Sequence, residues 1–485
     1  MKRWIDLFRA RPDRQVAAIL VVLTLVKFVL AAQCELTGYE ATYWYYAQHP
    51  DIGYFDHPAM TMWMVEASTF LFGDGLLGIR VIPVLAGGAA AWLTFLAGRR
   101  LYGARAGALA ACSVALAPMI FSIGSRVDPD SPLFLFWMAS VWALAHALSG
   151  DRPAWWYAAG LFLGLAMESK YTAIFFPLGV LLFLVCSRDH RAWLARREPY
   201  LAALAALIAF SPTVIWNAGH QWESFLFQAT GRIPEISGLN PSRIHGYPLS
   251  HLLLFTPILC LWAWGCGLKA AVRWRESSWQ DRLMVALGLP TLVFFLAILI
   301  ARPVKHHWPT PGYLTLFLLS ASSVVSAAPW VRRLHWGSIA LLMSGYLALP
   351  WAIVAVPEDF DSCWRRLGDE VRRRSPDFVI ANETWTATLL GYELRPVPSC
   401  DFAAVGRPGT RLARWWRADK FAGRDAVIVY ETYHFPRELD LVKKRFAVVE
   451  EPVVIRIPRN GNRETSWTLL RARGYAPLRG SAAQE

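Results

Sequence analysis

"VAAILVVLTLVKFVLAAQ", residues 16–33, is the first of the apolar segments that decide the fold. A helix of about 20 apolar residues crosses the hydrocarbon core of a bilayer. Basic residues precede this segment, as in a signal peptide, but Gln33 is poorly suited to cleavage and further apolar segments follow. We therefore interpret residues 16–33 as a retained membrane anchor.

The composition of the whole chain also suits lipid surroundings. Of its 485 residues, 55% are hydrophobic and 18% are charged, and the mean hydropathy is +0.31. Apolar segments recur at 16–33, 78–97, 104–122, 131–149, 153–167, 171–187, 199–215, 248–268, 283–300, 311–328 and 335–355. The sequence therefore predicts a polytopic α-helical membrane protein with about 11 transmembrane helices.

Basic residues divide unevenly between the loops. If the N-terminus lies inside, the predicted inside segments carry 19 Lys and Arg, and the outside loops carry six. This bias predicts the orientation of the spans. It also explains most of the net charge of +13 without a nucleic-acid partner, for which a basic soluble face would be expected.

The composition becomes polar after residue 356. Short β-like runs appear within 377–381, 425–431, 446–457 and 466–475, between turn and charge clusters. We expect a transmembrane domain over residues 1–356 and a small α/β domain over 357–485, which an odd number of spans places outside. There Cys363 and Cys400 could form a disulfide or remain thiols.

Acids, histidines and isolated cations gather in the predicted outside loops. These loops contain "GYE" (38–40), "GYFDHP" (53–58), "GSRVDPDSP" (124–132), "ESKYT" (168–172), "WNAGHQWESFLFQATGR" (216–232) and "ARPVKHHWP" (301–309). Charged groups near lipid are costly, so they are expected to face a water-filled cavity and to have a function. A site for a lipid-linked polar group is therefore predicted at the outer surface.

Five segments resemble, in this order and spacing, the bacterial polyprenyl-phosphate-sugar glycosyltransferases. They are "EATYWYYAQHPDIGYFDHPAMTMWMVEASTFLFGDGLLGIRV" (40–81), "DPDSPLFLFW" (128–137), "ESKYTAIFF" (168–176), "PTVIWNAGHQWESFLFQ" (212–228) and "KHHWPTPGYL" (305–314). This family has the GT-C fold and is related to protein O-mannosyltransferases and to the aminoarabinose and galacturonic acid transferases of lipid A. The resemblance covers roughly residues 15–330.

The resemblance implies inverting transfer of one sugar from a polyprenyl (undecaprenyl) phosphate to a hydroxyl of a lipid, lipid A, core glycan or similar acceptor. The reaction would occur on the periplasmic side of the bacterial inner membrane, among membrane lipids, with the C-terminal domain periplasmic. Such chemistry needs a carboxylate to accept the acceptor proton. It also needs cations for the departing phosphate.

The first outer loop departs from the family pattern. Most relatives have Asp-Glu at its start, whereas this chain has Tyr39-Glu40, so the usual Asp has no counterpart. Glu40 becomes the leading candidate for the catalytic base. A second, compatible interpretation is a capping box, in which Thr37 caps a helix and Glu40 bonds back to the cap amide.

Asp56 and His57 occupy the position where relatives often have Glu-Lys. The resemblance implies that Asp56 serves as a second candidate base and that His57 binds substrate. The alternative is that Asp56 caps the next helix, with Pro58 near its first turn.

The remaining candidates come from four later loops. Asp130 is a catalytic candidate, whose alternative is helix capping together with Ser131. Lys170 matches the family's "SKYT" motif, although a cation at a helix end also extends to lipid headgroups. The basic loop "RPVKHHWP" (302–309) could bind a donor phosphate, and the alternative is contact with anionic lipid headgroups. The substrate-binding candidates are Lys170, Asn217, Arg232, Arg302, Lys305, His306 and His307.

Two further possibilities remain at this point. No spacing resembles a metal-ligand set, so no cofactor is predicted, although a divalent metal at His57 with His306 or His307 is conceivable. The alternative function is a transporter or lipid flippase. That class is expected to have broken helices or charges near mid-membrane, whereas this chain gathers its polar groups at one surface.

Overall fold

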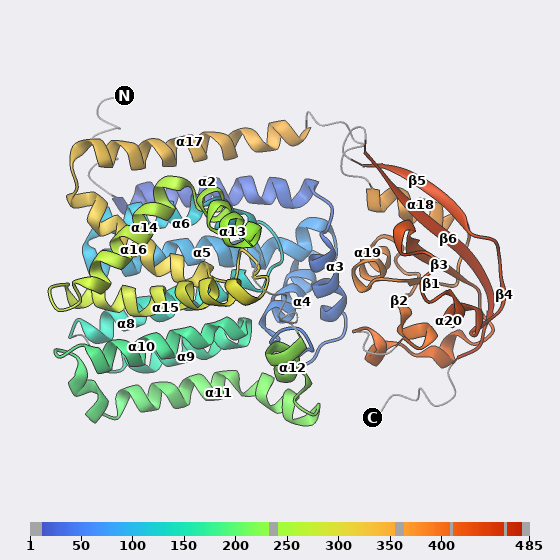
Figure 1. Cartoon of the computed structure of the whole chain (residues 1–485), viewed down its shortest axis with the longest axis horizontal. Helices are drawn as coiled ribbons and strands as arrows, with labels where there is room; N and C mark the ends of the chain where they lie inside the picture. The colour runs from blue at the N-terminus through green and yellow to red at the C-terminus, as the bar shows by residue number, and fades with distance from the viewer. Residues whose placement is uncertain are drawn as a thin grey trace. The chain divides into compact units, whose positions relative to one another are not determined.

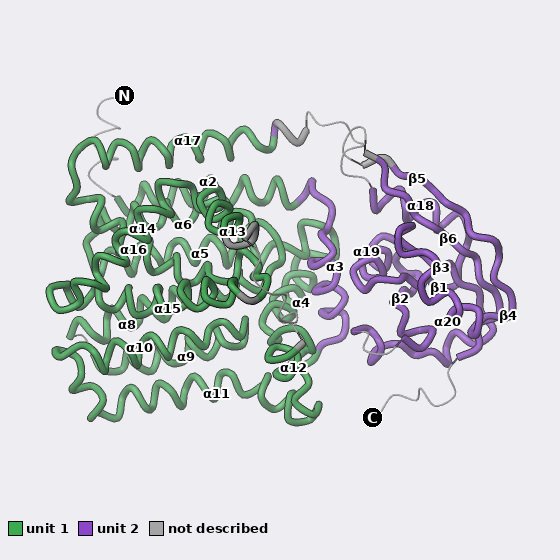
Figure 2. Tube along the Cα trace, viewed as in Figure 1, with its two compact units in different colours: residues 1–31, 51–350 green, residues 32–50, 351–485 purple. Residues whose placement is uncertain are grey.

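The computed structural model describes residues 12–150, 152–231, 241–354, 363–407, 411–459 and 463–477. The chain divides into two compact units (Figure 2). Unit 1 contains residues 1–31 and 51–350, and unit 2 contains residues 32–50 and 351–485. Unit 2 therefore combines the C-terminal region with a short segment from the first predicted outer loop.

Unit 1 is helical (Figure 1). Its helices are α2 (Pro12–Gln33), α4 (Met60–Phe72), α5 (Leu76–Tyr102), α6 (Ala104–Leu116), α7 (Pro118–Ile123), α8 (Asp130–Leu148), α9 (Trp155–Ser169), α10 (Phe175–Cys186), α11 (Glu198–Gly219), α12 (Glu223–Leu226), α13 (Pro241–Leu254), α14 (Pro257–Val272), α15 (Trp279–Ala301), α16 (Thr310–Ser326) and α17 (Pro329–Val354), the last residues of α2 and α17 falling in unit 2. Each of the apolar segments found in the sequence coincides with one or two of these helices. Helix α4, within the first outer loop, follows the segment where a helix start was considered as the alternative role of Asp56.

Helix length and composition indicate which helices could cross a membrane. Among the described residues, five helices are long and apolar enough to cross a membrane, or six if α13 and α14, bent by 111°, count as one span. Shorter apolar helices, such as α6 at Ala104–Leu116, accompany them. A mostly helical membrane fold is therefore confirmed, and the count of 11 spans stays a prediction.

Small residues allow α9 and α11 to pack closely. Gly160 and Gly164 are one turn apart on α9 and face the backbone of Ala202 and Ala206 on α11. A Cβ atom added at either glycine would lie closer than 3.0 Å to that backbone, nearer than real Cβ contacts allow. Small residues at four-residue spacing on both helices are the usual means of close packing in membranes.

The predicted inner loops contact one another at one end of the bundle. Arg282 Nη2 lies 2.6 Å from Asp189 Oδ2, and the Tyr102 hydroxyl donates to Asp281 Oδ1 at 3.0 Å. These contacts join the segments after α5 and α10 to the start of α15. The contacts among these predicted inner segments therefore agree with alternating helix directions, while the side of the membrane stays a prediction.

Unit 2 contains a six-stranded mixed sheet with helices. The strands are β1 (Phe378–Ala381), β2 (Ser399–Asp401), β3 (Ala426–Glu431), β4 (Phe446–Val449), β5 (Val453–Arg459) and β6 (Arg463–Tyr475), in the order β2-β1-β3-β6-β4 with β5 also paired to β6. Strands β1, β2 and β3 are parallel, and the pairs made by β6 are antiparallel. The predicted 446–457 run forms two strands, and the three-residue β2 was missed.

The helices of unit 2 include one from the distant first loop. They are α3 (Gly38–Ala47), α18 (Cys363–Arg372), α19 (Thr384–Glu393) and α20 (Leu439–Lys443). Helix α3 packs on α19, where the hydroxyls of Thr42 and Thr388 lie 3.2 Å apart. Cys363 and Cys400 are both buried and free, so the disulfide considered for them is absent.

Candidate functional site

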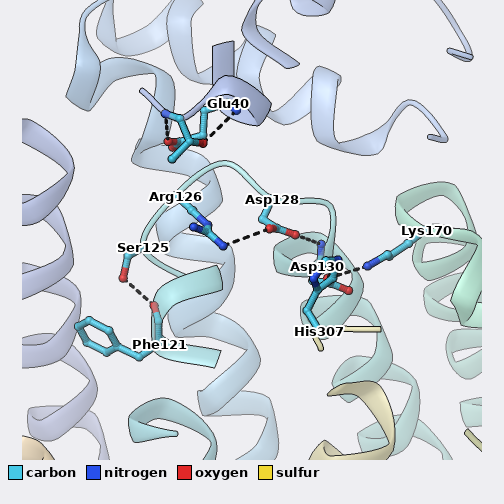
Figure 3. A network of polar contacts seen from close by, with 9 residues as sticks. Glu40, Phe121, Ser125, Arg126, Asp128, Asp130, Lys170 and His307 are labelled. Carbon is cyan, nitrogen blue, oxygen red and sulfur yellow. Dashed lines mark hydrogen bonds and ion pairs between the residues drawn. The ribbon is translucent and has the colours of Figure 1, made fainter. Parts of the chain in front are cut away.

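A buried ion pair lies at the start of α8. Asp130, the first residue of that helix, has a side chain with 0% exposure, and its Oδ2 accepts a hydrogen bond from Lys170 Nζ at 2.6 Å. His307 Nε2 lies 3.9 Å from the same oxygen (Figure 3). Three loops that are far apart in the sequence therefore bring one carboxylate and two nitrogen bases together.

The start of α8 is fixed by a neighbouring acid. Asp128 Oδ1 accepts from the Asp130 amide at 3.0 Å, and Arg126 Nη2 lies 3.9 Å from Asp128 Oδ2 (Figure 3). The alternative in which Ser131 takes part in capping is wrong, because its hydroxyl donates to the Pro83 carbonyl at 2.7 Å. The carboxylate of Asp130 is thereby left to interact with Lys170 instead of with its own helix.

Asp56 and His57 are both buried in the loop before α4. The Asp56 carbonyl accepts from Gln228 Nε2 at 2.7 Å, which joins this loop to the segment after α12. Helix α4 starts at Met60, and its cap residue is Ala59, without a side-chain cap bond. The capping alternative for Asp56 is therefore wrong.

Glu168, at the end of α9, is a site residue that the sequence reasoning missed. It is fully buried, and its Oε1 accepts from the Thr213 hydroxyl at 2.7 Å and from the Ala59 amide at 3.2 Å. Among the described residues, no hydrogen-bond partner reaches its Oε2. Glu168 thus connects the Asp56 loop to α11 and lies two residues before Lys170. Its place in "ESKYT" was the available signal.

Asn217 is held by local contacts one turn after Thr213. Its Nδ2 donates to the Thr213 carbonyl at 2.9 Å, and its Oδ1 accepts from the Phe225 amide at 3.1 Å. These bonds tie α12 to the end of α11. They occupy polar atoms that were predicted to bind substrate.

The side chains of the basic loop between α15 and α16 point to different partners. His307 faces Asp130, whereas His306 Nδ1 lies 2.9 Å from the Ser250 hydroxyl and its ring stacks on Tyr247. Burial lowers the pKa of His306. Lys305 is exposed and Arg302 is half-buried. The loop therefore presents its cations in more than one direction.

An apolar cavity of about 410 Å³ lies beside this loop. Tyr247 and His251 of α13, Trp264 of α14 and Tyr313 of α16 contribute to its lining. The Tyr313 hydroxyl accepts from Trp264 Nε1 at 3.0 Å and lies 3.1 Å from His251 Nδ1. The cavity thus has an apolar interior, and its wall continues to the stacked His306.

Glu40 lies in unit 2 and makes the predicted capping box. Its Oε2 accepts from the Thr37 amide at 3.0 Å, and its own amide donates to Thr37 Oγ1 at 3.3 Å (Figure 3). The structural interpretation of Glu40 is confirmed, and its catalytic role stays a prediction. Arg232 lies outside the described residues. Within the described ranges, no group of three His, Cys, Asp or Glu side chains could hold a metal.

The fold and this polar cluster define a multi-pass membrane protein with a buried site at one end of its bundle. Residues 56–216 match the family model of dolichyl-phosphate-mannose-protein mannosyltransferases. The chain is 28% identical over 321 residues to the undecaprenyl phosphate-alpha-4-amino-4-deoxy-L-arabinose arabinosyl transferase of Pseudomonas aeruginosa, covering 62% of this chain and 55% of that protein. It is 24% identical over 328 residues to the lipid A galacturonosyltransferase RgtD of Rhizobium johnstonii, covering 65% of each.

Solved structures have the same fold. The crystal structure of ArnT from Cupriavidus metallidurans bound to undecaprenyl phosphate aligns with a TM-score of 0.68 and 17% identity, over 94% of this chain and 98% of that one. The oligosaccharyltransferase of Archaeoglobus fulgidus aligns with a TM-score of 0.54 and 12% identity, over 96% and 74% of the two chains. The predicted resemblance to GT-C glycosyltransferases is thereby confirmed, although the sequence matches cover less than two thirds of the curated relatives.

Proposed function

We propose that the chain is an inverting glycosyltransferase, which moves a single sugar from undecaprenyl phosphate to a hydroxyl of lipid A, a core glycan or a similar lipid acceptor. The observation that carries this proposal is the buried cluster of Asp130, Lys170 and His307, with Glu168 two residues from the lysine. Relatives that transfer sugars from undecaprenyl phosphate, or onto lipid A, support the choice of donor and acceptor.

The carboxylates and the cations of the site would have different roles in the reaction. A carboxylate accepts the proton of the acceptor hydroxyl, whose oxygen then attacks the anomeric carbon from the face opposite the phosphate. The bond from that carbon to the phosphate oxygen breaks, and the phosphate leaves with the lipid. Lys170, His307 and His57 would stabilise its charge. Asp130, paired with Lys170, acts as a positioning residue, and the base is Glu40 or Asp56.

The donor's polyprenyl chain would occupy the apolar cavity lined by Tyr247, Trp264 and Tyr313. This placement is supported by the stacking of His306 on Tyr247, because it puts a basic loop next to an apolar lining. An isoprenoid tail gains free energy from apolar burial, while its phosphate needs cations and water. Lys305 and Arg302 would bind this phosphate as it enters.

The sidedness of the reaction follows from the charge asymmetry of the loops. Because basic loops face the cytoplasm, the cluster around Asp130 would lie on the periplasmic side of the inner membrane, and unit 2 would be periplasmic. The transporter alternative receives no support from the relatives reported above, whose names are those of transferases.

The function is tested with purified full-length protein in detergent, undecaprenyl phosphate carrying a radiolabelled sugar, and lipid A. Label should move to lipid A and should require the polyprenyl donor. Aminoarabinose and galacturonic acid are the first sugars to supply, because the relatives carry these names. Absence of transfer from every donor, together with movement of labelled lipid across vesicles, would favour the transporter.

Two conservative variants identify the base. Glu40→Gln keeps a residue that can form the capping box but cannot accept a proton, and Asp56→Asn keeps the shape of the side chain. The variant that removes the base should lower the rate by about 10² to 10⁴. Full transfer by the double variant would contradict a mechanism that uses either carboxylate. Thermal unfolding of each variant serves as the control for folding.

A further inference from the structure

Unit 2 contains a second cavity, with a lining unlike that of the apolar one in unit 1. Its volume is about 380 Å³, and every lining residue belongs to unit 2. The lining combines the end of α3, the segment before β2 and the segment 415–421. Aromatic and cationic side chains dominate it, and none of the described lining residues is an Asp or a Glu.

The aromatic rings of the lining form two groups of contacting rings, and both groups are partly exposed. His49 stacks on Trp415 with centroids 4.9 Å apart and an angle of 26°, and Tyr45 lies 5.0 Å from His49. Trp416 stacks on Phe421 at 4.4 Å, nearly parallel. All five rings remain half-buried instead of fully covered. Rings held by mutual stacking provide rigid apolar faces at little further cost in conformational entropy.

Three cations border these rings. Arg395, Arg417 and Lys420 line the cavity and are exposed. The Arg395 guanidinium lies 3.8 Å from the centre of the Tyr392 ring, which holds it in place. Glu393 lies near Arg395 but does not line the cavity. Arg417 and Lys420 place two exposed positive charges at the cavity, whose described lining contains no carboxylate, so an anion bound there would be attracted to both.

A ligand for this lining needs both an apolar face and a negative charge. The C–H face of a pyranose ring packs on aromatic rings, while its phosphate or carboxylate accepts hydrogen bonds from Arg and Lys. A neutral saccharide would not use the charges of Arg417 and Lys420, and a bare anion would leave the rings uncovered. We propose that this cavity binds an anionic saccharide, through the rings of Tyr45 and Trp415 and the cations Arg395, Arg417 and Lys420.

Binding at this cavity does not require sugar transfer, and its existence does not rest on the proposed function. If that function holds, the occupant would be an acidic or phosphorylated sugar of the acceptor glycan. Binding is measured without turnover, so failure of the site and failure of transfer are distinguishable. A variant of a candidate base, Asp56→Asn, should keep this binding, because residue 56 belongs to unit 1 and does not line the cavity.

The test is calorimetric titration of the full-length protein, in a neutral detergent, with glucose 1-phosphate, glucose and inorganic phosphate. The cavity variant is Arg417→Ala with Lys420→Ala. The matched control is Lys443→Ala with Lys444→Ala, because these exposed cations of unit 2 do not line the cavity. Arg417→Gln with Lys420→Gln provides a second cavity variant if the first fails to fold.

Glucose 1-phosphate should bind the wild type and the control variant with similar affinity. It should bind the cavity variant at least tenfold more weakly. Glucose and inorganic phosphate should each bind more weakly than the sugar phosphate. Equal affinity of the cavity variant and the control variant for glucose 1-phosphate would overturn the proposal. Inorganic phosphate binding as tightly as glucose 1-phosphate would reduce the site to a simple anion site. A last outcome is that phosphatidylglycerol added to the micelles displaces glucose 1-phosphate more strongly than free glucose or phosphate does. That result would identify a lipid headgroup as the occupant and would also overturn the proposal.

Discussion

A buried carboxylate such as that of Asp130 is costly to keep in an apolar bundle unless a cation accompanies it. Here Lys170 supplies the cation at 2.6 Å, and both side chains are almost completely enclosed. The nearby pair of Arg126 and Asp128 differs, because its atoms are 3.9 Å apart and the Arg126 side chain is 40% exposed. Two ion pairs of the same loop region should therefore respond very differently to mutation.

Replacing Lys170 by Met should lower the stability of unit 1 by about 3–5 kcal/mol, because Asp130 remains buried without its cation. Asp130→Asn combined with Lys170→Met should recover most of this loss. Arg126→Met should cost less than about 1 kcal/mol. Thermal midpoints of the purified variants measure these differences. A single Lys170→Met variant as stable as the double variant would show that the pair carries no such coupling.

Activity separates positioning from stability in the same series. If Lys170 contacts the donor phosphate, the stable double variant should remain deficient in transfer. Recovery of both stability and transfer in that variant would limit the pair to a structural role. The double-mutant comparison is appropriate because the two residues are in direct contact.

At the scale of single elements, a partly buried histidine follows helix α3. His49 follows α3, packs on Trp415, and has its Nδ1 3.0 Å from the Tyr45 carbonyl. Burial lowers the pKa of His49, while the bond to that carbonyl opposes this shift. His49 also lines the cavity to which Arg395, Arg417 and Lys420 contribute. Protonation of His49 is therefore disfavoured in the folded state.

The stability of unit 2 should consequently fall in acid. Because the folded pKa of His49 lies below the ordinary value, the unfolded chain takes up the proton first as the pH falls below about 6.5. The contribution of neutral His49 to the stability of unit 2 is therefore complete above that pH, and it is lost as the pH falls toward the lower folded pKa. His49→Phe should show a smaller drop in thermal midpoint between pH 7.5 and pH 5 than the wild type. Identical drops would exclude His49 as a cause.

The contact between α9 and α11 leads to a prediction about packing. Gly160→Ala should destabilise the protein by about 1–3 kcal/mol, because the new methyl group would overlap the Ala202 backbone and the helices must separate. Gly265 in α14 is the control, since no heavy atom lies within 4 Å of a Cβ placed there. Gly265→Ala should be neutral, or stabilising by up to about 1 kcal/mol. Similar thermal midpoints for the two variants would contradict the close packing.

For the whole molecule, local patterns predicted more than long-range contacts. Apolar length predicted the helices, and the Thr37 to Glu40 spacing predicted a capping box that the structure contains. Both depend on residues close together in the chain. The bonds of Glu168 to Ala59 and Thr213 depend on helices separated by many residues, and no periodicity reports such pairings.

The composition of unit 2 shows the same limit. Residues 34–50 were assigned to an outer loop, yet α3 packs on α19, more than three hundred residues later in the chain. The cavity formed with Trp415 and Arg417 follows from that packing. Aromatic residues of the "YWYY" run (43–46) contact Tyr392 and Trp415, and the sequence alone does not show which partner covers them.

The orientation of the whole molecule is testable with reporter fusions. Alkaline phosphatase fused after residue 477 should be active, because its disulfides form only in an oxidising compartment and unit 2 is proposed to be periplasmic. A fusion within residues 187–197, in the basic loop between α10 and α11, should be inactive. The reverse pattern would place Asp130 and Lys170 at the cytoplasmic surface. Because a lipid-linked sugar and its acceptor must meet on one side of the membrane, that pattern would also require a cytoplasmic acceptor.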